Sequence, residues 1–220
     1  MDFLTGCPDE AMLAIAETSS LAQWKMVQLR NDCLSYPDLI RRGVAVEQLL
    51  HRHQSEQLQG NDTASSRLLN SAAVKLEDNR SLVANIFREA ATLYLHTVLS
   101  NPVPGKQLFN FGLCPKSHLV TGVPEISASV ETLIQLFSRL PPSDLDRGLI
   151  FPICLAACMT NDSTRRDFFK NRIRNLNESF GNLLQIRRLM EAIWQKRDIC
   201  GKETDLRESI QEQGLKLLLI

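Results

Sequence analysis

The chain has 220 residues, of which 44% are hydrophobic and 23% are charged, and its 25 basic residues balance its 25 acidic ones. That length suits one large domain, or two small ones, with room for a substantial core. Zero formal charge is unusual for a protein that holds nucleic-acid phosphates along its surface, so the chain is a poor candidate for binding DNA by itself.

The cysteines form no CxxC pair, although there are six of them, at positions 7, 33, 114, 154, 158 and 200. The short loops that hold structural zinc are therefore not expected, and the pattern is typical of reduced, buried thiols in an intracellular protein. The opening MDFLTGCPDEAM is acidic and has no apolar run, so we expect no signal peptide. The apolar run 149–159 would rise about 16 Å as a helix, roughly half of a bilayer core, so we predict no membrane span.

Helical spacing of apolar residues dominates the first part of the chain. A first helix is predicted to open at CPDEAMLAIAE, where Pro8 suits the first turn and Asp9 and Glu10 suit the positive end of the helix dipole. A second helix is predicted through Trp24, and a third is predicted to begin near Pro37.

A polar stretch at 55–66 predicts a surface loop, and two apolar stripes follow it. They form one long helix, or two that divide near Asp78. The longer stripe comes in pairs every four residues and predicts one wide buried face, made of Leu82, Val83, Ile86, Phe87, Ala90, Ala91, Tyr94, Leu95, Val98 and Leu99. Residues 101–123 then break the pattern with three prolines and three glycines, an unusually long irregular link for a domain interior.

The second half begins with a helix predicted from Pro124, and Ser143 with Asp146 is a variant of the capping box that opens another helix. This next helix contains LIFPICLAACMT, which is apolar on all sides and must be surrounded by other helices. Pro152 predicts a kink in it, because proline removes one backbone hydrogen bond and crowds the carbonyl of Gly148.

These patterns predict an all-α fold. We expect a single-domain array of about eight to ten packed helices around a central buried helix at roughly 143–160. One domain would cover residues 1–220, with an irregular insertion or loop at 101–123.

Candidate chemistry is sparse. His51 and His53 point about 200° apart on a helix and cannot share a metal ion, and His96 fits a satisfied core histidine. Cys154 and Cys158 share a helix face, but two soft ligands do not make a zinc site, so packing is favoured. The chain contains no DDxxD, P-loop, GxSxG or HExxH motif. We therefore predict no catalytic residue, no metal site and no cofactor.

A basic bias lies between residues 161 and 200, with nine Lys or Arg against five Asp or Glu. Its main members are Arg165, Arg166, Arg187, Arg188, Lys196 and Arg197. A solvated helix face is favoured over a nucleic-acid surface, because no aromatic residues alternate with these charges.

Several segments, in order, resemble one family. They are LTGCPDEAMLAIAETSSLAQWK, FREAATLYLHTVLSNPVPG, the long stretch from PEISASVETLIQLF to RRDFFKNRI, and FGNLLQIRRLMEAIWQKRD. They are similar to the fungal-specific transcription factor domain, the C-terminal regulatory domain of fungal zinc binuclear cluster regulators. The resemblance implies a nuclear regulatory domain that contacts the transcription machinery or other proteins, forms a homodimer, or answers a small apolar ligand. The alternatives are an all-helical enzyme of secondary metabolism and a domain-only scaffold protein.

Two departures from that family pattern stand out. The six-cysteine zinc cluster of such regulators is missing, so we expect either a fragment or a domain-only protein that makes no direct contact with DNA. The segment KQLFNFGLCPKSHLVTG, residues 106–122, interrupts the pattern and suggests a retained in-frame intron or a lineage insertion. For the ligand, the core around Phe151, Met159, Phe168 and Trp194 is the candidate pocket.

Overall fold

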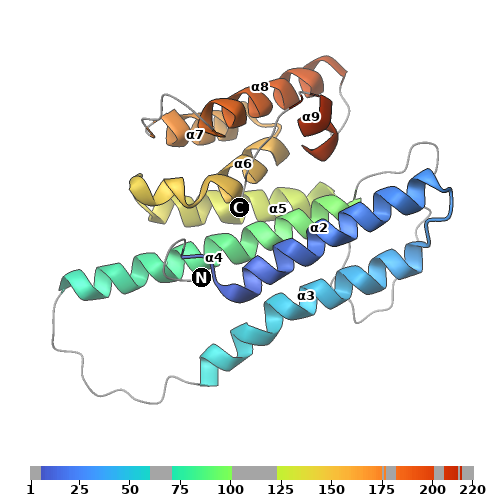
Figure 1. Ribbon diagram of the computed structural model, residues 1–220. Helices are drawn as coiled ribbons and strands as arrows, with labels where there is room; N and C mark the ends of the chain where they lie inside the picture. Colours follow the sequence, from blue (N-terminus) through green and yellow to red (C-terminus); the bar gives the residue numbers. More distant parts are fainter. Residues whose placement is uncertain are drawn as a thin grey trace. The chain divides into compact units, whose positions relative to one another are not determined.

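The computed structural model describes residues 6–59, 71–100, 123–174, 176, 182–200, 206–212 and 214. Within these ranges every regular element is a helix and no strand occurs, which confirms the all-α prediction (Figure 1). The chain divides into two compact units, Met1–Ser129 and Val130–Ile220, where the sequence predicted a single array. None of the described helices combines the length and the hydropathy that crossing a bilayer requires.

The first unit contains helices α2 (Asp9–Arg30), α3 (Tyr36–Gln59) and α4 (Ser71–Ser100), and each of the three packs against the other two. α2 is continuous, so the predicted division into two helices is wrong. The polar residues between the two predicted helices are accommodated inside α2. The hydroxyls of Thr18 and Ser20 donate to the carbonyls of the residues four positions earlier, at 2.7 and 3.1 Å, and so need no partner outside it.

Helix α4 is also continuous, which excludes the alternative of two helices divided near Asp78. All ten residues of the predicted stripe are buried. Helix α3 runs further than predicted and takes in the first part of the loop expected at 55–66, while 60–70 lie outside the described residues. A Cβ at Gly43 would lie 2.9 Å from Leu99 Cδ1, so the glycine allows α3 to approach α4 closely.

Two charged side chains of α2 are held by α4. Oε1 of Glu10 accepts hydrogen bonds from Nη2 and Nε of Arg88, at 2.6 and 2.9 Å. Nζ of Lys25, a residue only 6% exposed, donates to the carbonyl of Val98 at 2.6 Å. These bonds give the α2–α4 contact a defined register, which apolar packing alone does not set.

The second unit contains most of α5 (Val123–Arg139), which crosses the boundary, and then the 3-10 helix η1 (Asp144–Arg147), α6 (Ile150–Met159), α7 (Ser163–Arg174), α8 (Asn182–Cys200) and α9 (Leu206–Glu212). Within it α6 contacts α7 and α8, and α8 also contacts α7 and α9. Every residue from Phe151 to Cys158 is buried, which confirms that this apolar run is interior.

The helix predicted at roughly 143–160 is two elements, and the predicted kink at Pro152 is wrong. Pro152 is the third residue of α6, where a backbone N–H has no acceptor within the helix. The first helical hydrogen bond runs from the next residue, Ile153, to the carbonyl of Leu149 at 3.0 Å. The Ser143 hydroxyl makes no capping bond, so only part of the predicted capping box exists.

Asp146, the other half of that box, keeps a hydrogen bond with the Ser143 backbone and is also buried against Arg172. The Arg172 side chain is 4% exposed, and its Nε and Nη2 donate to Oδ1 of Asp146 at 3.1 and 2.8 Å. Nη1 and Nη2 also donate to the carbonyls of Phe137 and Leu140, at 2.7 and 2.9 Å. One guanidinium on α7 therefore joins the carboxyl end of α5 to η1.

Several finer predictions remain predictions: the count of about eight to ten helices, one helix at the centre of the whole chain, and a single domain over 1–220. The segment 101–122, with the proposed intron at 106–122, lies outside the described residues.

We expect Arg172→Met to lower the free energy of unfolding of the second unit by about 3–5 kcal/mol. Methionine keeps most of the buried volume, but it leaves a buried carboxylate and two carbonyls without their donor. Chemical denaturation in a Trp24→Phe background, followed by the fluorescence of Trp194, measures the change, because the chain has one tryptophan in each unit. The matched control is Arg188→Met, because Arg188 is exposed on α8; equal losses in the two variants would contradict the assignment.

Candidate functional site at the carboxyl end of helix α6

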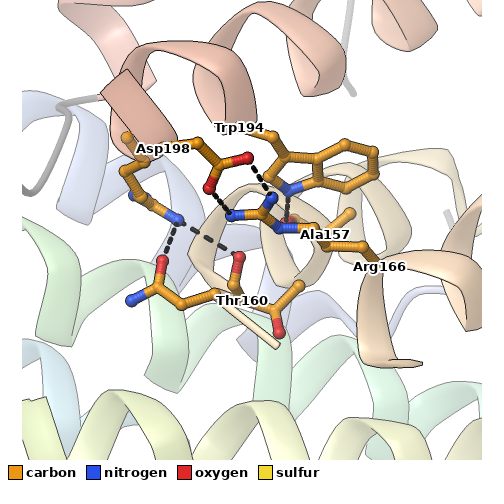
Figure 2. A network of polar contacts seen from close by, with 7 residues as sticks. Ala157, Thr160, Arg166, Trp194 and Asp198 are labelled. Carbon is orange, nitrogen blue, oxygen red and sulfur yellow. Dashed lines mark hydrogen bonds and ion pairs between the residues drawn. The ribbon is translucent and has the colours of Figure 1, made fainter. Parts of the chain in front are cut away.

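The carboxyl end of α6 is held by side chains of α8. A helix ends with carbonyls that have no partner inside it, and it carries partial negative charge there. Nε1 of Trp194 donates to the carbonyl of Ala157 at 2.8 Å, as Figure 2 shows. Nη1 of Arg197 donates to the carbonyl of Thr160, at 3.3 Å, and to Oδ1 of Asn161, at 3.1 Å. One indole of α8 thus donates to the last turn of α6, and one cation of α8 donates to the two residues that follow it.

Helix α7 covers the same indole with two cations. Cζ of Arg166 lies 5.5 Å from the centre of the Trp194 ring, and Nζ of Lys170 lies 5.0 Å from it. Arg166 also forms a bidentate ion pair with Asp198 of α8, in which Nη1 donates to Oδ2 at 2.8 Å and Nη2 donates to Oδ1 at 2.9 Å (Figure 2). The hydrogen bonds from Arg166 hold the pKa of Asp198 below its ordinary value. Indole, guanidinium and carboxylate together fix how α7 and α8 meet at the end of α6.

The four predicted pocket residues differ in burial and in their position along the helices. Phe151 and Trp194 are buried, whereas Met159 and Phe168 are partly exposed. Phe151 and Met159 lie near opposite ends of α6, about 12 Å apart along the helix axis. Trp194 lies at the Met159 end. Phe168 packs edge-on against Phe169, with ring centres 5.3 Å apart.

Arg166 and Lys170 are four residues apart and share the face of α7 that covers Trp194. Phe168, two positions from each, lies on the other side of the helix. The prediction that the four residues line a ligand pocket therefore stays a prediction.

The structure confirms the cysteine predictions only in part. Cys154 and Cys158 are fully buried within α6, as the packing interpretation predicted, and Cys7 is buried too. A hydrogen bond with Cys154, together with burial, raises the pKa of Cys158 well above its ordinary value, so this thiol stays protonated. Cys33 is exposed, which contradicts the expectation of buried thiols throughout. Cys114 and the side chain of Cys200 lie outside the described residues.

The histidines also differ from expectation in one case. His51 is exposed on α3, and the side chain of His53 lies outside the described residues. His96 is half-buried, but its Nδ1 has no hydrogen-bond partner among the described residues, so it is not the satisfied core histidine predicted. No group of three or more potential metal ligands comes together within the described ranges.

The cations of the basic bias at 161–200 are in part solvated, as predicted, but they also serve a structural role. Most of these cations bind the chain itself: Arg165 pairs with Glu131, Lys196 pairs with Glu212, and Nη2 of Arg187 donates to the carbonyl of Ile173. Arg172 was not singled out from the sequence. A signal existed, because Arg172 shares its helical face with Phe169 and Leu176, and a charge on an apolar stripe indicates a buried partner.

Comparison with known proteins gives one consistent result. The sequence profile described as the fungal specific transcription factor domain matches residues 1–220. A trichothecene biosynthesis transcription regulator, TRI10 of Trichoderma arundinaceum, is 29% identical over 225 residues, covering 100% of this chain and 45% of that protein. TRI10 of Fusarium sporotrichioides is 27% identical over 224 residues, with 100% and 45% covered.

A third relative, the transcription factor dibT of Pestalotiopsis microspora, is 26% identical over 237 residues, covering 100% of this chain and 34% of that protein. The chain thus spans less than half the length of these relatives. No solved structure matches.

We expect Trp194→Phe to lower the thermal unfolding midpoint of the second unit and to lose about 1–3 kcal/mol of stability. Phenylalanine keeps an aromatic ring in the site but cannot donate to the buried Ala157 carbonyl. Amide exchange of the last turn of α6 should accelerate in the variant. Trp24→Phe is the control, because Trp24 makes a cation–π contact with Arg42 at 4.5 Å but lies in the first unit. The same acceleration in α6 with this control would contradict the local role of the Trp194 bond.

Proposed function

The chain belongs to the fungal specific transcription factor domain family, and from this membership we propose that it controls transcription through contacts with other proteins. The family match over residues 1–220 is the observation that carries the proposal. The three relatives are transcription regulators or factors, so the function as a regulatory transcription factor domain follows from the comparison.

The polar groups of the described site are arranged for packing rather than for reaction. Its donor groups form hydrogen bonds to carbonyls at helix ends and to a buried carboxylate; they belong to Trp194, Arg197 and Arg172. A catalytic acid or base needs a reachable proton and a place for substrate. The relatives are named as transcription regulators or a transcription factor, which favours a regulatory domain over the alternative of an enzyme of secondary metabolism.

Recognition of DNA is proposed to lie outside this chain. Most of the guanidinium groups of its most basic segment already bind carboxylates or carbonyls of the same chain. To bind DNA phosphates, these guanidinium groups would have to give up their bonds within the chain. We propose that the whole protein works in the nucleus, with this chain supplying contacts to the transcription machinery or to a second copy of itself.

A reporter assay tests the regulatory function. The chain is fused to an unrelated sequence-specific DNA-binding domain, and a reporter with moderate basal expression carries the matching sites. We expect expression to change at least about fivefold in either direction relative to the DNA-binding domain alone, a coupling of about 1 kcal/mol.

Arg172→Met should weaken the change because it destabilises the second unit, whereas Arg188→Met should preserve it. Immunoblotting must show equal amounts of each fusion. Reporter output equal to that of the bare DNA-binding domain, at equal protein level, would refute the proposal.

A small apolar ligand is proposed as one input, with Phe151, Met159, Phe168 and Trp194 as the candidate lining. A ligand that binds only the folded state raises stability by mass action, by about 2.7 kcal/mol at one hundred times its dissociation constant. We expect at least one member of a sterol panel to raise the thermal midpoint in proportion to the logarithm of its concentration.

Phe168→Ala should reduce that gain, and Leu145→Ala should not, because Leu145 is an exposed leucine outside the candidate lining. A midpoint that stays constant across the panel removes sterols as the ligand class.

A further inference from the structure

Three ionisable side chains from three helices interact within the first unit. His96 lies near the carboxyl end of α4, Glu47 on α3 and Glu125 in the first turn of α5. Both carboxylates act electrostatically on His96. Nδ1 of His96 and Oε2 of Glu125 are buried, and neither has a hydrogen-bond partner among the described residues. Buried polar atoms without partners are rare and costly, so this junction is a weak point of the first unit.

Among the described residues, a small set of charged groups lies on the elements around His96. On α3, the side chain of Glu47 is 18% exposed, and its Oε1 lies 4.0 Å from Nε2 of His51, which is 68% exposed. On α5 the facing group is Glu125. On α2, Lys25 is directed to the carbonyl of Val98, two residues beyond His96. On α4 itself, Glu89 lies two turns earlier.

Burial and charge act on His96 in opposite directions. Burial lowers its pKa, while Glu47 and Glu125 raise it and offset only part of the effect. His96 is therefore neutral at neutral pH. An unfolded chain presents the imidazole to water, where it binds a proton more readily.

We propose that His96, with Glu47 and Glu125 beside it, is a proton-responsive contact that loosens the packing of α4 in the first unit as the pH falls below neutrality. A histidine that binds protons more weakly when folded stabilises the fold fully above its unfolded pKa. That contribution is lost as the pH falls from the unfolded pKa toward the folded one. Mild acid thus shifts the first unit toward looser states. This inference does not depend on the proposed regulatory function.

Glu89 changes the stability of the first unit with pH in the opposite direction to His96. Burial raises its pKa, and a hydrogen bond with Ser129 offsets part of the rise. An acid with a raised folded pKa gains stability as the pH falls through that pKa. The bulk pH dependence of the wild type therefore combines both groups, and differences between variants isolate His96.

The chain has two tryptophans, one in each unit, which allows a test specific to the first unit. In a Trp194→Phe background, the fluorescence of Trp24 follows denaturation of the first unit alone. We expect its denaturant midpoint to fall between pH 7.5 and about pH 5.5, and His96→Gln to remove more than about half of that fall.

Two further variants show whether the fall in the midpoint comes from His96. His51→Gln, which replaces the exposed histidine beside the same glutamate, should leave the fall intact. Glu125→Gln should enlarge it, because one of the charges that favour protonated His96 is removed. An equal fall with and without His96 would overturn the proposal.

If His96→Gln does not fold, an NMR titration of His96 in the unmodified chain decides the question. An apparent pKa clearly below the ordinary value of 6.5 supports the proposal, and a value at or above it refutes the proposal.

Discussion

The fold depends on how the carboxyl ends of its helices find hydrogen-bond donors. In a chain whose described regular structure is all helical, each helix leaves carbonyls without partners at its end. Here donors from other elements supply the bonds: Lys25 for α4, Arg172 for α5, Trp194 and Arg197 for α6, and Arg187 for α7. Four of these five are cations, which also suit the negative end of the helix dipole.

This constraint accounts for the charge pattern of the second unit. A basic segment in a chain of zero net charge first suggests a ligand of opposite sign. Within the described residues the opposite sign is supplied internally, by carbonyl dipoles at helix ends and by Asp146, Asp198, Glu131 and Glu212. The cations are therefore committed to tertiary structure, and their number says little about nucleic acids.

The sequence predicted features that depend on spacing within one helix. It missed features that depend on where a helix begins or on residues far apart in the chain. The paired stripe of α4 marks its buried face, because spacing of four residues is a property of the helix itself. Acidic residues after Pro8 marked the start of α2 for the same reason. The sequence did not show that Thr18 and Ser20 would bond within α2, nor that Pro152 would fall in the first turn of α6, because both depend on where the helix begins.

In the candidate site, the sequence identified Trp194 as an interior aromatic residue but not its bond to Ala157. That bond joins residues 37 positions apart, and helical periodicity carries no information on such a pairing. Arg172 could have been found, since its helical face is apolar; its partner Asp146 could not, because Asp146 was already explained as a capping residue.

Directional bonds matter most where apolar packing is least specific. Helix α6 is apolar on all sides, so burial alone would stabilise many rotations and translations of it nearly equally. The Trp194 and Arg197 bonds select one of these arrangements, because moving α6 by one residue would leave their donors without acceptors. At the His96 junction in the first unit, Nδ1 of His96 and Oε2 of Glu125 lack such bonds within the described residues. A contact that no directional bond fixes responds to small changes in charge.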